Sequence, residues 1–319
     1  MNEHYIKAMT WDYPEEVPMM IGILPAMWMR LGDEMIRFAR EYADLIRYIP
    51  ASAEECRRHL APRYRAGEWT DEWGCVWRND HEGMDAYIAG HPVPRREDIA
   101  ALQIPANCES NLLPHGLMYL RLLDLRGFEE AMFDFADECD ELQVLIDKVL
   151  EYNCRQIAYK LPEVDRVMGF GDDLGMQNGL AIGAAKWRKY LGPCFAKMFG
   201  MVKAAGKLVY LHTDGCIHEI MPDLQACGAD MINPQFRANG LENLVRVCRG
   251  KIPINLDLDR QMFPFATPAQ VKEHVRECVE ALWLPQGGLG LNLELNYDVP
   301  LENAAALLDA LREVRNYRG

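Results

Sequence analysis

The residues best suited to chemistry are His212 and Asp214, which directly follow a short apolar segment of this 319-residue chain. Val209–Leu211 has the composition of a buried strand, and Ile217–Cys227 has the apolar spacing of a helix. Residues two apart on a strand point to the same side, so both side chains can address one ligand while Thr213 faces away. In α/β folds, ligands bind where the strands end. The pattern predicts a functional pair; the alternative is a helix-capping aspartate beside a hydrogen-bonded histidine.

Other polar residues also stand at the ends of expected strands and are candidates for the same site. Asp172 and Asp173 are adjacent acids, and one of them can serve as an acid or base with a raised pKa, unless Asp173 only caps a turn. His115 has only its place at a strand end in its favour, and Trp28 suits either a pocket wall or plain packing. We therefore predict three catalytic residues: His212, Asp214 and Asp173. The predicted substrate-binding residues are Asp172, His115, Trp28, Asn233 and Asp257.

The order of the expected elements indicates the fold class. From Glu141 onward, helices and strands alternate with short connections, which is typical of an open doubly wound sheet or a closed (β/α)8 barrel. No Gly-x-Gly-x-x-Gly follows the first strand, so neither a nicotinamide nor a flavin cofactor is expected. Polar residues at the ends of many strands favour a barrel with one shared rim. The expected strands are Val17–Leu24, Asn111–Gly116, Val164–Phe170, Val209–Leu211, Asp230–Asn233, Ile254–Asp257 and Gly288–Glu294. The expected helices are Trp28–Arg47, Met118–Asp124, Gly127–Glu138, Glu141–Leu161, Ala184–Ala205, Ile217–Cys227, Leu241–Arg249, Pro268–Leu282 and Pro300–Val314.

Residues 63–93 differ in character from the rest of the chain. Glu68–Trp77 alternates large and polar residues and is followed by a turn at Asn79–Gly83, which predicts a β-hairpin excursion. Its aromatic residues are expected to pack against the body, and a stacking platform is the alternative. No Pro/Gly/Ser-rich linker divides the chain, so we expect one domain over residues 1–319 with a hairpin insertion.

The composition narrows the class of protein. A formal charge of −14 and a pI near 5.1 argue against a nucleic-acid groove. Ten cysteines, mostly isolated within helical patterns, suit a reducing cytosol better than a disulfide framework. Neither a signal peptide nor a membrane span is indicated. We expect a cytoplasmic protein, monomeric or homodimeric, that acts on a small molecule.

Seven motifs in order resemble the uroporphyrinogen decarboxylase superfamily. The resemblance is strong in the C-terminal half and weaker at Val17–Gly22 and Asp71–Trp77, and it implies a distorted (β/α)8 barrel, similar to a TIM barrel. The motifs are Gly171-Asp-Asp-Leu-Gly-Met-Gln-Asn-Gly-Leu180, Trp187-Arg-Lys-Tyr-Leu-Gly-Pro193, Leu211-His-Thr-Asp-Gly215, Ile232-Asn-Pro234, Asn255-Leu-Asp-Leu-Asp259, Thr267-Pro268 and Asp298-Val-Pro-Leu-Glu-Asn303.

That superfamily contains two chemistries, and the first strand bears on which one applies. True decarboxylases act without a cofactor on an acetate-bearing tetrapyrrole and resemble one another in an Arg-Gln-Ala-Gly-Arg segment whose arginines hold propionates. Here the corresponding segment, Ile21–Arg30, has one arginine and several apolar residues. Such a rim holds a multiply anionic porphyrinogen poorly. The resemblance is therefore closer to the methyltransferase-like branch.

Membership of that branch implies a zinc site and methyl transfer to or from a corrinoid protein or a thiol. The family ligands are His-x-Cys after one strand and a Cys after the last strand; this chain keeps His212 but has Asp214 at the first cysteine position. Glu294 lies near the position of the second family cysteine. The resemblance therefore implies a ligand set of His212, Asp214 and Glu294, which can bind zinc through carboxylate oxygens. The alternative is that the metal has been lost and the side chains only hydrogen-bond a substrate.

Three functions follow as expectations. The first is a methyltransferase-like, O-demethylase-like enzyme that moves a methyl group between a small substrate and a corrinoid protein or thiol, with zinc assisting. The second is a cofactor-free decarboxylase or lyase of a small carboxylated substrate, in which Asp173, His212 and Asp214 protonate a carbanion-like intermediate. The third is a catalytically degenerate barrel that binds a ligand or a partner.

Overall fold

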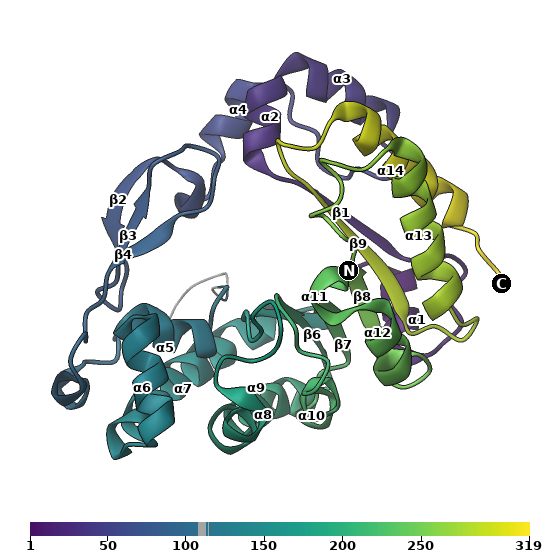
Figure 1. The fold of residues 1–319 in the computed structure, drawn as a ribbon. Helices are drawn as coiled ribbons and strands as arrows, with labels where there is room; N and C mark the ends of the chain where they lie inside the picture. The colour runs from purple at the N-terminus through teal and green to yellow at the C-terminus, as the bar shows by residue number, and fades with distance from the viewer. Residues whose placement is uncertain (108–112, 114) are drawn as a thin grey trace. The chain divides into compact units, whose positions relative to one another are not determined.

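The computed structural model describes residues 1–107, 113 and 115–319 (Figure 1). The chain divides into two compact units. Unit 1 comprises Met1–Glu68, Arg78–Tyr87 and Gln235–Gly319, and unit 2 comprises Trp69–Trp77 and Ile88–Pro234. The single-domain organisation expected for residues 1–319 stays a prediction. No helix in the described part of the chain is both long and apolar enough to cross a membrane.

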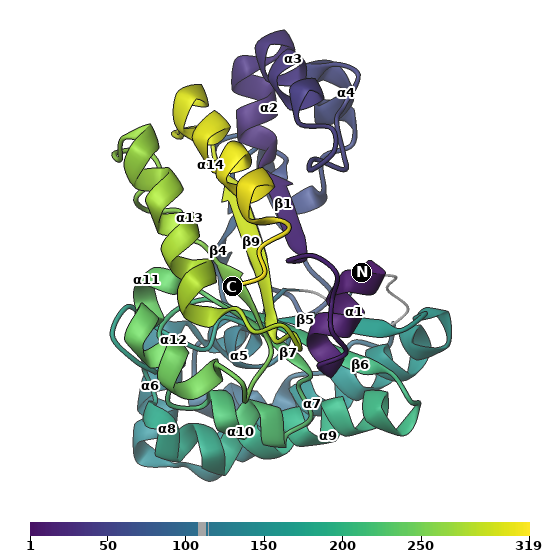
Figure 2. The ribbon, with the colours of Figure 1, turned by 90° about the vertical axis from the view of Figure 1, so that its right-hand side faces the viewer.

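Unit 1 is built on three parallel strands in the order β1-β9-β8. Met19 of β1 lies opposite Leu291 of β9, and Ile254 of β8 lies opposite Leu289. Helices α13 and α14 lie side by side in both ribbon views (Figures 1 and 2). The strands are β1 (Met19–Ile23), β8 (Ile254–Asp257) and β9 (Leu289–Leu295), and the helices are α1 (Glu3–Thr10), α2 (Pro25–Leu31), α3 (Asp33–Glu41), α4 (Ala53–Arg58), α11 (Phe236–Asn239), α12 (Leu241–Cys248), α13 (Pro268–Leu282) and α14 (Leu301–Val314), with a 3₁₀ turn at Pro62–Tyr64.

Unit 2 contains three more parallel strands, in the order β7-β6-β5. All four residues of β7 are buried, as expected of parallel strands covered on both faces. Aromatic side chains join α9 to the sheet, with the rings of Phe170 and Phe199 5.0 Å apart and edge-on. The strands are β5 (Val167–Gly171), β6 (Leu208–Thr213) and β7 (Met231–Pro234), and the helices are α5 (Tyr119–Arg126), α6 (Phe128–Asp137), α7 (Asp140–Lys160), α8 (Gly183–Lys186), α9 (Gly192–Ala204) and α10 (Met221–Ala226), with 3₁₀ turns at Arg96–Ala101 and Leu161–Glu163.

The predicted hairpin excursion is a small sheet of three strands in the order β2-β3-β4. These strands are β2 (Gly67–Thr70), β3 (Val76–Asn79) and β4 (Tyr87–Gly90). The half-buried rings of Trp69 and Trp77 stack with centroids 6.1 Å apart. These two tryptophans of the segment therefore pack against each other.

Three predicted helices have different bounds in the structure. The helix expected over Trp28–Arg47 is two helices, because Gly32 has φ 52°. The helix expected over Ile217–Cys227 begins only at Met221, since Pro222 fits the first turn of a helix and not its interior. A π-helical turn at Trp187–Leu191 separates α8 from α9. Half of the strand expected at Asn111–Gly116 lies outside the described residues, and within the described half His115 forms a parallel bridge with Gly171.

The chain segments that follow β5 and β6 run side by side and are held by backbone hydrogen bonds. The N–H of Gly175 donates to the carbonyl of Asp214 (3.1 Å), and the N–H of Cys216 donates to that of Met176 (2.8 Å). Gly215 has φ 85°, and a Cβ built on it would lie 2.1 Å from the carbonyl oxygen of Gly175. The two backbones are therefore in direct contact, and only glycine fits at this position.

Replacing Gly215 with alanine is expected to lower the free energy of unfolding by at least about 3 kcal/mol, because it adds left-handed backbone strain to a backbone clash. Gly206 is a matched control: it has φ 71° but nothing within 4 Å of a built Cβ. Gly206→Ala should cost only about 1 kcal/mol. Urea unfolding of both variants measures the difference, and equal losses would show that the close approach does not form.

Candidate functional site

Four titratable side chains of unit 2 come together where β5 and β6 end. His115 Nε2 lies 3.0 Å from Asp173 Oδ2. His212 Nε2 lies 3.8 Å from Asp173 Oδ1 and 3.5 Å from Asp214 Oδ1. The two imidazole rings have centroids 5.4 Å apart. These four residues, together with Asn233, are called the strand-end cluster.

Asn233 fixes the orientation of the His212 ring. The Nδ1–H of His212 donates to Oδ1 of Asn233 over 2.8 Å, and the amide side chain of Asn233 is buried. Parallel pairing of β6 with β7 sets these residues directly opposite each other. The hydrogen bond selects the tautomer that leaves Nε2 as the basic nitrogen, pointing at the two carboxylates.

His115 reaches the cluster because Gly171 has no side chain. A Cβ built on Gly171 would lie 2.6 Å from His115 Nδ1, closer than any contact between such atoms can be. The backbone N–H of Gly116 also donates to the carbonyl of Gly171 over 2.8 Å. Gly171, the first residue of the Gly171–Leu180 motif, therefore leaves room for the imidazole of His115, which comes from a distant part of the chain.

Asp173 is the carboxylate at the centre of the cluster. Burial alone would raise its pKa, but the hydrogen bond from His115 and the positive charges that His115 and His212 can carry outweigh burial and lower the pKa. Its Oδ1 also accepts the backbone N–H of Asp214 over 3.1 Å. The four titratable side chains are each between 28% and 32% exposed, so a small molecule or ion can reach them.

Asp172 lies in a different environment from Asp173. It is fully buried, and its two oxygens accept the backbone N–H groups of Met118, Tyr119 and Leu120, over 3.2, 2.6 and 3.0 Å. Burial raises its pKa to about 7 against the lowering effect of these hydrogen bonds. The predicted role of Asp172 in substrate binding does not fit this burial: it caps the N-terminus of α5.

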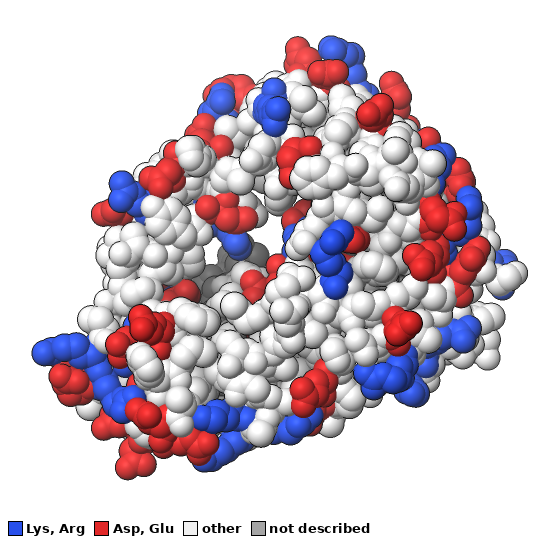
Figure 3. Space-filling view, in the orientation of Figure 1, with Lys and Arg blue, Asp and Glu red and all other residues white. Residues whose placement is uncertain are grey.

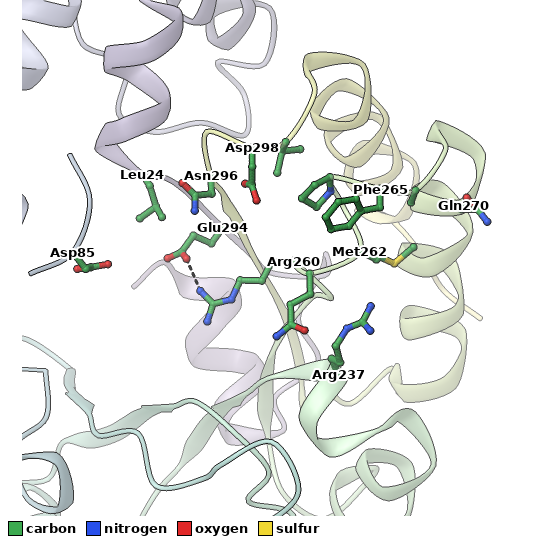
Figure 4. A pocket seen from close by; sticks show the side chains of 14 residues that line it. Leu24, Asp85, Arg237, Arg260, Met262, Phe265, Gln270, Glu294, Asn296 and Asp298 are labelled. Atoms are coloured by element: carbon green, nitrogen blue, oxygen red, sulfur yellow. Dashed lines mark hydrogen bonds and ion pairs between the residues drawn. The ribbon is translucent and has the colours of Figure 1, made fainter. Parts of the chain in front are cut away.

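A second candidate region is a cavity of about 950 Å³ in unit 1 (Figure 4). It opens beside the carboxyl ends of β8 and β9, where barrel folds bind ligands. Arg260 lies at its centre, and its Nη1 is 2.5 Å from Glu294 Oε1. Arg237 makes two 2.8 Å contacts with the carboxylate of Asp259. The cavity is lined by Leu24, Asp85, Arg237, Arg260, Gln261, Met262, Pro264, Phe265, Ala266, Gln270, Glu294, Asn296, Asp298 and Val299.

The remaining predicted site residues also lie in unit 1. Asp257 is buried, accepts a hydrogen bond from Asn292 over 3.0 Å and lies 3.4 Å from the Arg260 guanidinium. Trp28 is 2% exposed within α2, so it packs in the interior and does not line the cavity. Glu294 belongs to unit 1 and pairs with Arg260. His212 and Asp214 lie together in unit 2.

The prediction missed Arg237 and Arg260. Arg260 directly follows the Asn255–Asp259 run, so its place after a strand was a usable signal. Arg237 had no such signal, because a single arginine at the start of a short helix is ordinary surface composition. On the face shown in Figure 3, acidic and basic side chains are interspersed.

The strand-end cluster also suits a divalent metal ion. Among the described residues, His115, Asp173 and His212 each offer one ligand atom, and these atoms lie within 4.8 Å of one another. Two imidazoles and one carboxylate are ligands that zinc accepts, and three protein ligands leave a position open for a substrate.

Comparison with known proteins identifies the family and the fold. Residues 124–314, more than half of the chain, match the family model described as uroporphyrinogen decarboxylase (URO-D). A methyltransferase from Methanosarcina mazei is similar in fold, with a TM-score of 0.68 at 17% sequence identity over 97% of this chain and 97% of that chain. This match confirms the predicted α/β fold of the TIM-barrel type. A dihydropteroate synthase from Xanthomonas albilineans covers 51% of this chain and 59% of its own at 16% identity, and its TM-score of 0.33 is too low to carry an argument. No curated protein is significantly similar in sequence.

Replacing Asp172 with alanine is expected to lower the free energy of unfolding by about 2–3 kcal/mol, because three backbone N–H groups, two of them buried, lose their acceptor. Asp165, exposed and six residues before β5 ends, is the control, and Asp165→Ala should change stability by less than about 0.5 kcal/mol. Urea denaturation compares them. An Asp172→Ala protein as stable as the wild type would contradict the capping role.

His274 in unit 1 gives a pH-dependent prediction. It is buried, its Nε2 accepts the backbone N–H of Asp259 over 3.0 Å, and burial lowers its pKa to about 4. The unfolded chain therefore binds this proton first as the pH falls, so stability is lost between about pH 6.5 and pH 4, by up to about 3 kcal/mol.

His274→Gln removes this titration and should lose less stability than the wild type over that pH range. His59→Gln, at an exposed position, is the control and should follow the wild type. Urea midpoints at pH 7 and pH 4.5 make the comparison; parallel losses in the wild type and His274→Gln would contradict the assignment.

Proposed function

Since the chain belongs to the uroporphyrinogen decarboxylase family, we propose that it is an enzyme of the methyltransferase-like branch of that family. It moves a methyl group between a small methylated substrate and a corrinoid protein or a thiol. The observation that carries the proposal is the strand-end cluster, which sets a basic imidazole nitrogen beside two carboxylates at a solvent-accessible place. The fold match to the Methanosarcina methyltransferase over nearly its full length supports it.

The cluster's own groups account for the proton that the reaction must move. When a thiol accepts the methyl group, its proton goes to His212 Nε2, which the hydrogen bond to Asn233 keeps available as a base. Asp173 and Asp214, both within 4 Å of that nitrogen, stabilise the imidazolium that forms. A divalent ion held by the cluster would occupy His212 Nε2 in place of that proton, and Asp214, 3.5 Å from the same nitrogen, would then be the base. The ion would supply Lewis-acid activation of the thiolate or of the methyl-bearing heteroatom.

The methyl step itself balances without an external oxidant. With a methylcorrinoid donor, the carbon–cobalt bond breaks, a carbon–sulfur bond forms, and the electron pair of the broken bond stays on cobalt, which is reduced from Co(III) to Co(I). In the demethylation of an ether substrate, the corrinoid Co(I) donates the pair to the methyl carbon and the departing oxygen takes a proton.

Decarboxylation of a tetrapyrrole is less well supported by the arginines of unit 1. Arg30 donates to the carbonyl oxygen of Tyr297 over 3.2 Å and stacks over the ring of the same residue. Arg237 and Arg260 each face carboxylates that offset their charge. A ligand with several carboxylates would have to displace these contacts.

A cofactor-free lyase acting on a small carboxylated substrate is the second candidate. The 3.0 Å contact between His115 Nε2 and Asp173 Oδ2 favours it, because such a pair can deliver a proton to a carbanion. Release of carbon dioxide from a set of small carboxylic acids, with no corrinoid or thiol added, would distinguish this candidate from methyl transfer.

His212→Ala and Asp214→Ala are expected to lower methyl transfer by about 100-fold or more, since general bases contribute effects of that size. Methylcobalamin is the donor, 2-mercaptoethanol is the acceptor, and the visible spectrum of the corrinoid reports the loss of its methyl group. Asp165→Asn and His59→Ala, at exposed positions outside the cluster, should keep wild-type activity.

Both cluster variants should retain the wild-type far-ultraviolet spectrum, because the half-buried side chains of His212 and Asp214 lie outside the apolar core. Wild-type turnover in folded Asp214→Ala would remove that residue from the mechanism. Turnover that survives in folded His212→Ala would overturn the proposed site.

A further inference from the structure

We infer that His115, Asp173 and His212 form a thiolate-free divalent-metal site, with Asn233 as the residue that positions His212. This site differs from the His212, Asp214 and Glu294 set implied by the family resemblance. It deepens the proposed function but does not depend on it, because it follows from the geometry of unit 2.

The spacing of the three residues is that of a coordination shell. With metal–nitrogen and metal–oxygen bonds of about 2.0–2.2 Å, ligand atoms at tetrahedral angles lie roughly 3.3–3.6 Å apart. His115 Nε2 lies 3.0 Å and His212 Nε2 lies 3.8 Å from oxygens of Asp173, and the ligand atoms of all three residues lie within 4.8 Å of one another. Small side-chain adjustments therefore bring them to bonding distance of one ion.

The second argument is the orientation of His212. Histidines that bind metals usually donate their other ring N–H to an oxygen, which fixes the tautomer. The 2.8 Å bond from His212 Nδ1 to Asn233 Oδ1 is of this kind, and Asn233 is only 3% exposed. The backbone N–H of Asp214 likewise donates to Oδ1 of Asp173, so the central carboxylate is held as well.

The nearest cysteine in sequence does not take part. Cys216 is 7% exposed, its Sγ lies 3.4 Å from His218 Nδ1, and burial raises the pKa of its thiol. Glu294 already pairs with Arg260 at 2.5 Å. A site with only nitrogen and oxygen donors is harder than one with thiolates, so it accepts zinc, cobalt(II) or iron(II) and has no preference for a soft ion such as cadmium.

Metal binding by the full chain tests the inference without any turnover. After chelator treatment and dialysis, calorimetric titration with Zn²⁺ should give one tight equivalent per chain, and Co²⁺ should give ligand-field bands without a sulfur-to-cobalt charge-transfer band. His115→Ala, Asp173→Ala and His212→Ala should each weaken binding by at least 100-fold. A site unaffected by His115→Ala, or a charge-transfer band from sulfur, would overturn the assignment.

Asn233 requires a test that separates positioning from folding. Asn233→Ala should weaken zinc binding by about 10–100-fold, as expected for a residue that orients a ligand. Asn233→Asp keeps an oxygen acceptor for the Nδ1–H and should bind zinc as tightly as the wild type. Equal binding in the alanine and wild-type proteins, or equal weakening in both variants with unchanged urea midpoints, would show that Asn233 does not position His212.

Glu294→Gln discriminates between the two ligand sets, since it should leave zinc affinity unchanged here and weaken it if Glu294 binds the metal. If the protein binds zinc but transfers no methyl group, the metal site stands and the proposed methyltransferase function is refuted. If the protein transfers methyl groups but binds no metal, the proposed function stands and the metal site is refuted. His59→Ala controls for adventitious binding by an exposed imidazole and should titrate like the wild type.

Discussion

The close approach of the backbone at Gly175 and Gly215 is the constraint on which the strand-end cluster depends. A Cβ on either glycine would lie within 2.6 Å of the other segment. Because neither residue has one, the segment after β5 continues beside the segment after β6, joined by hydrogen bonds between their backbones. Asp173 comes from the first segment and Asp214 from the second, so their side chains meet although 41 residues separate them in the chain.

The same constraint explains why two adjacent acids behave differently. In an extended segment, neighbouring side chains point to opposite sides. Asp172 therefore turns inward to the first N–H groups of α5, where the helix dipole and three hydrogen bonds hold a carboxyl group. Asp173 turns outward to two imidazoles. One acid positions a helix and the other faces solvent and ligand, although the sequence presents them as a pair.

In unit 1 the charged groups around the cavity offset one another. Arg237 pairs with Asp259, and Arg260 lies between Asp257 and Glu294. Guanidinium groups held by carboxylates are well ordered but have little charge left for an anionic ligand. The Ile21–Arg30 segment likewise adds only one arginine.

The sequence by itself determined the alternation of helices and strands, the parallel class of fold, and the places where His212, Asp214 and Asp173 follow strands, because apolar periodicity and glycine positions act locally. It made His115 a candidate for the same site but did not determine its contact with Asp173, since that contact spans 58 residues and depends on the missing side chain of Gly171. Nor did it assign Asn233 to His212, a pairing set by the register of β6 on β7. Only tertiary structure decides which strand ends face each other, because pairing register and backbone approach are properties of two segments at once.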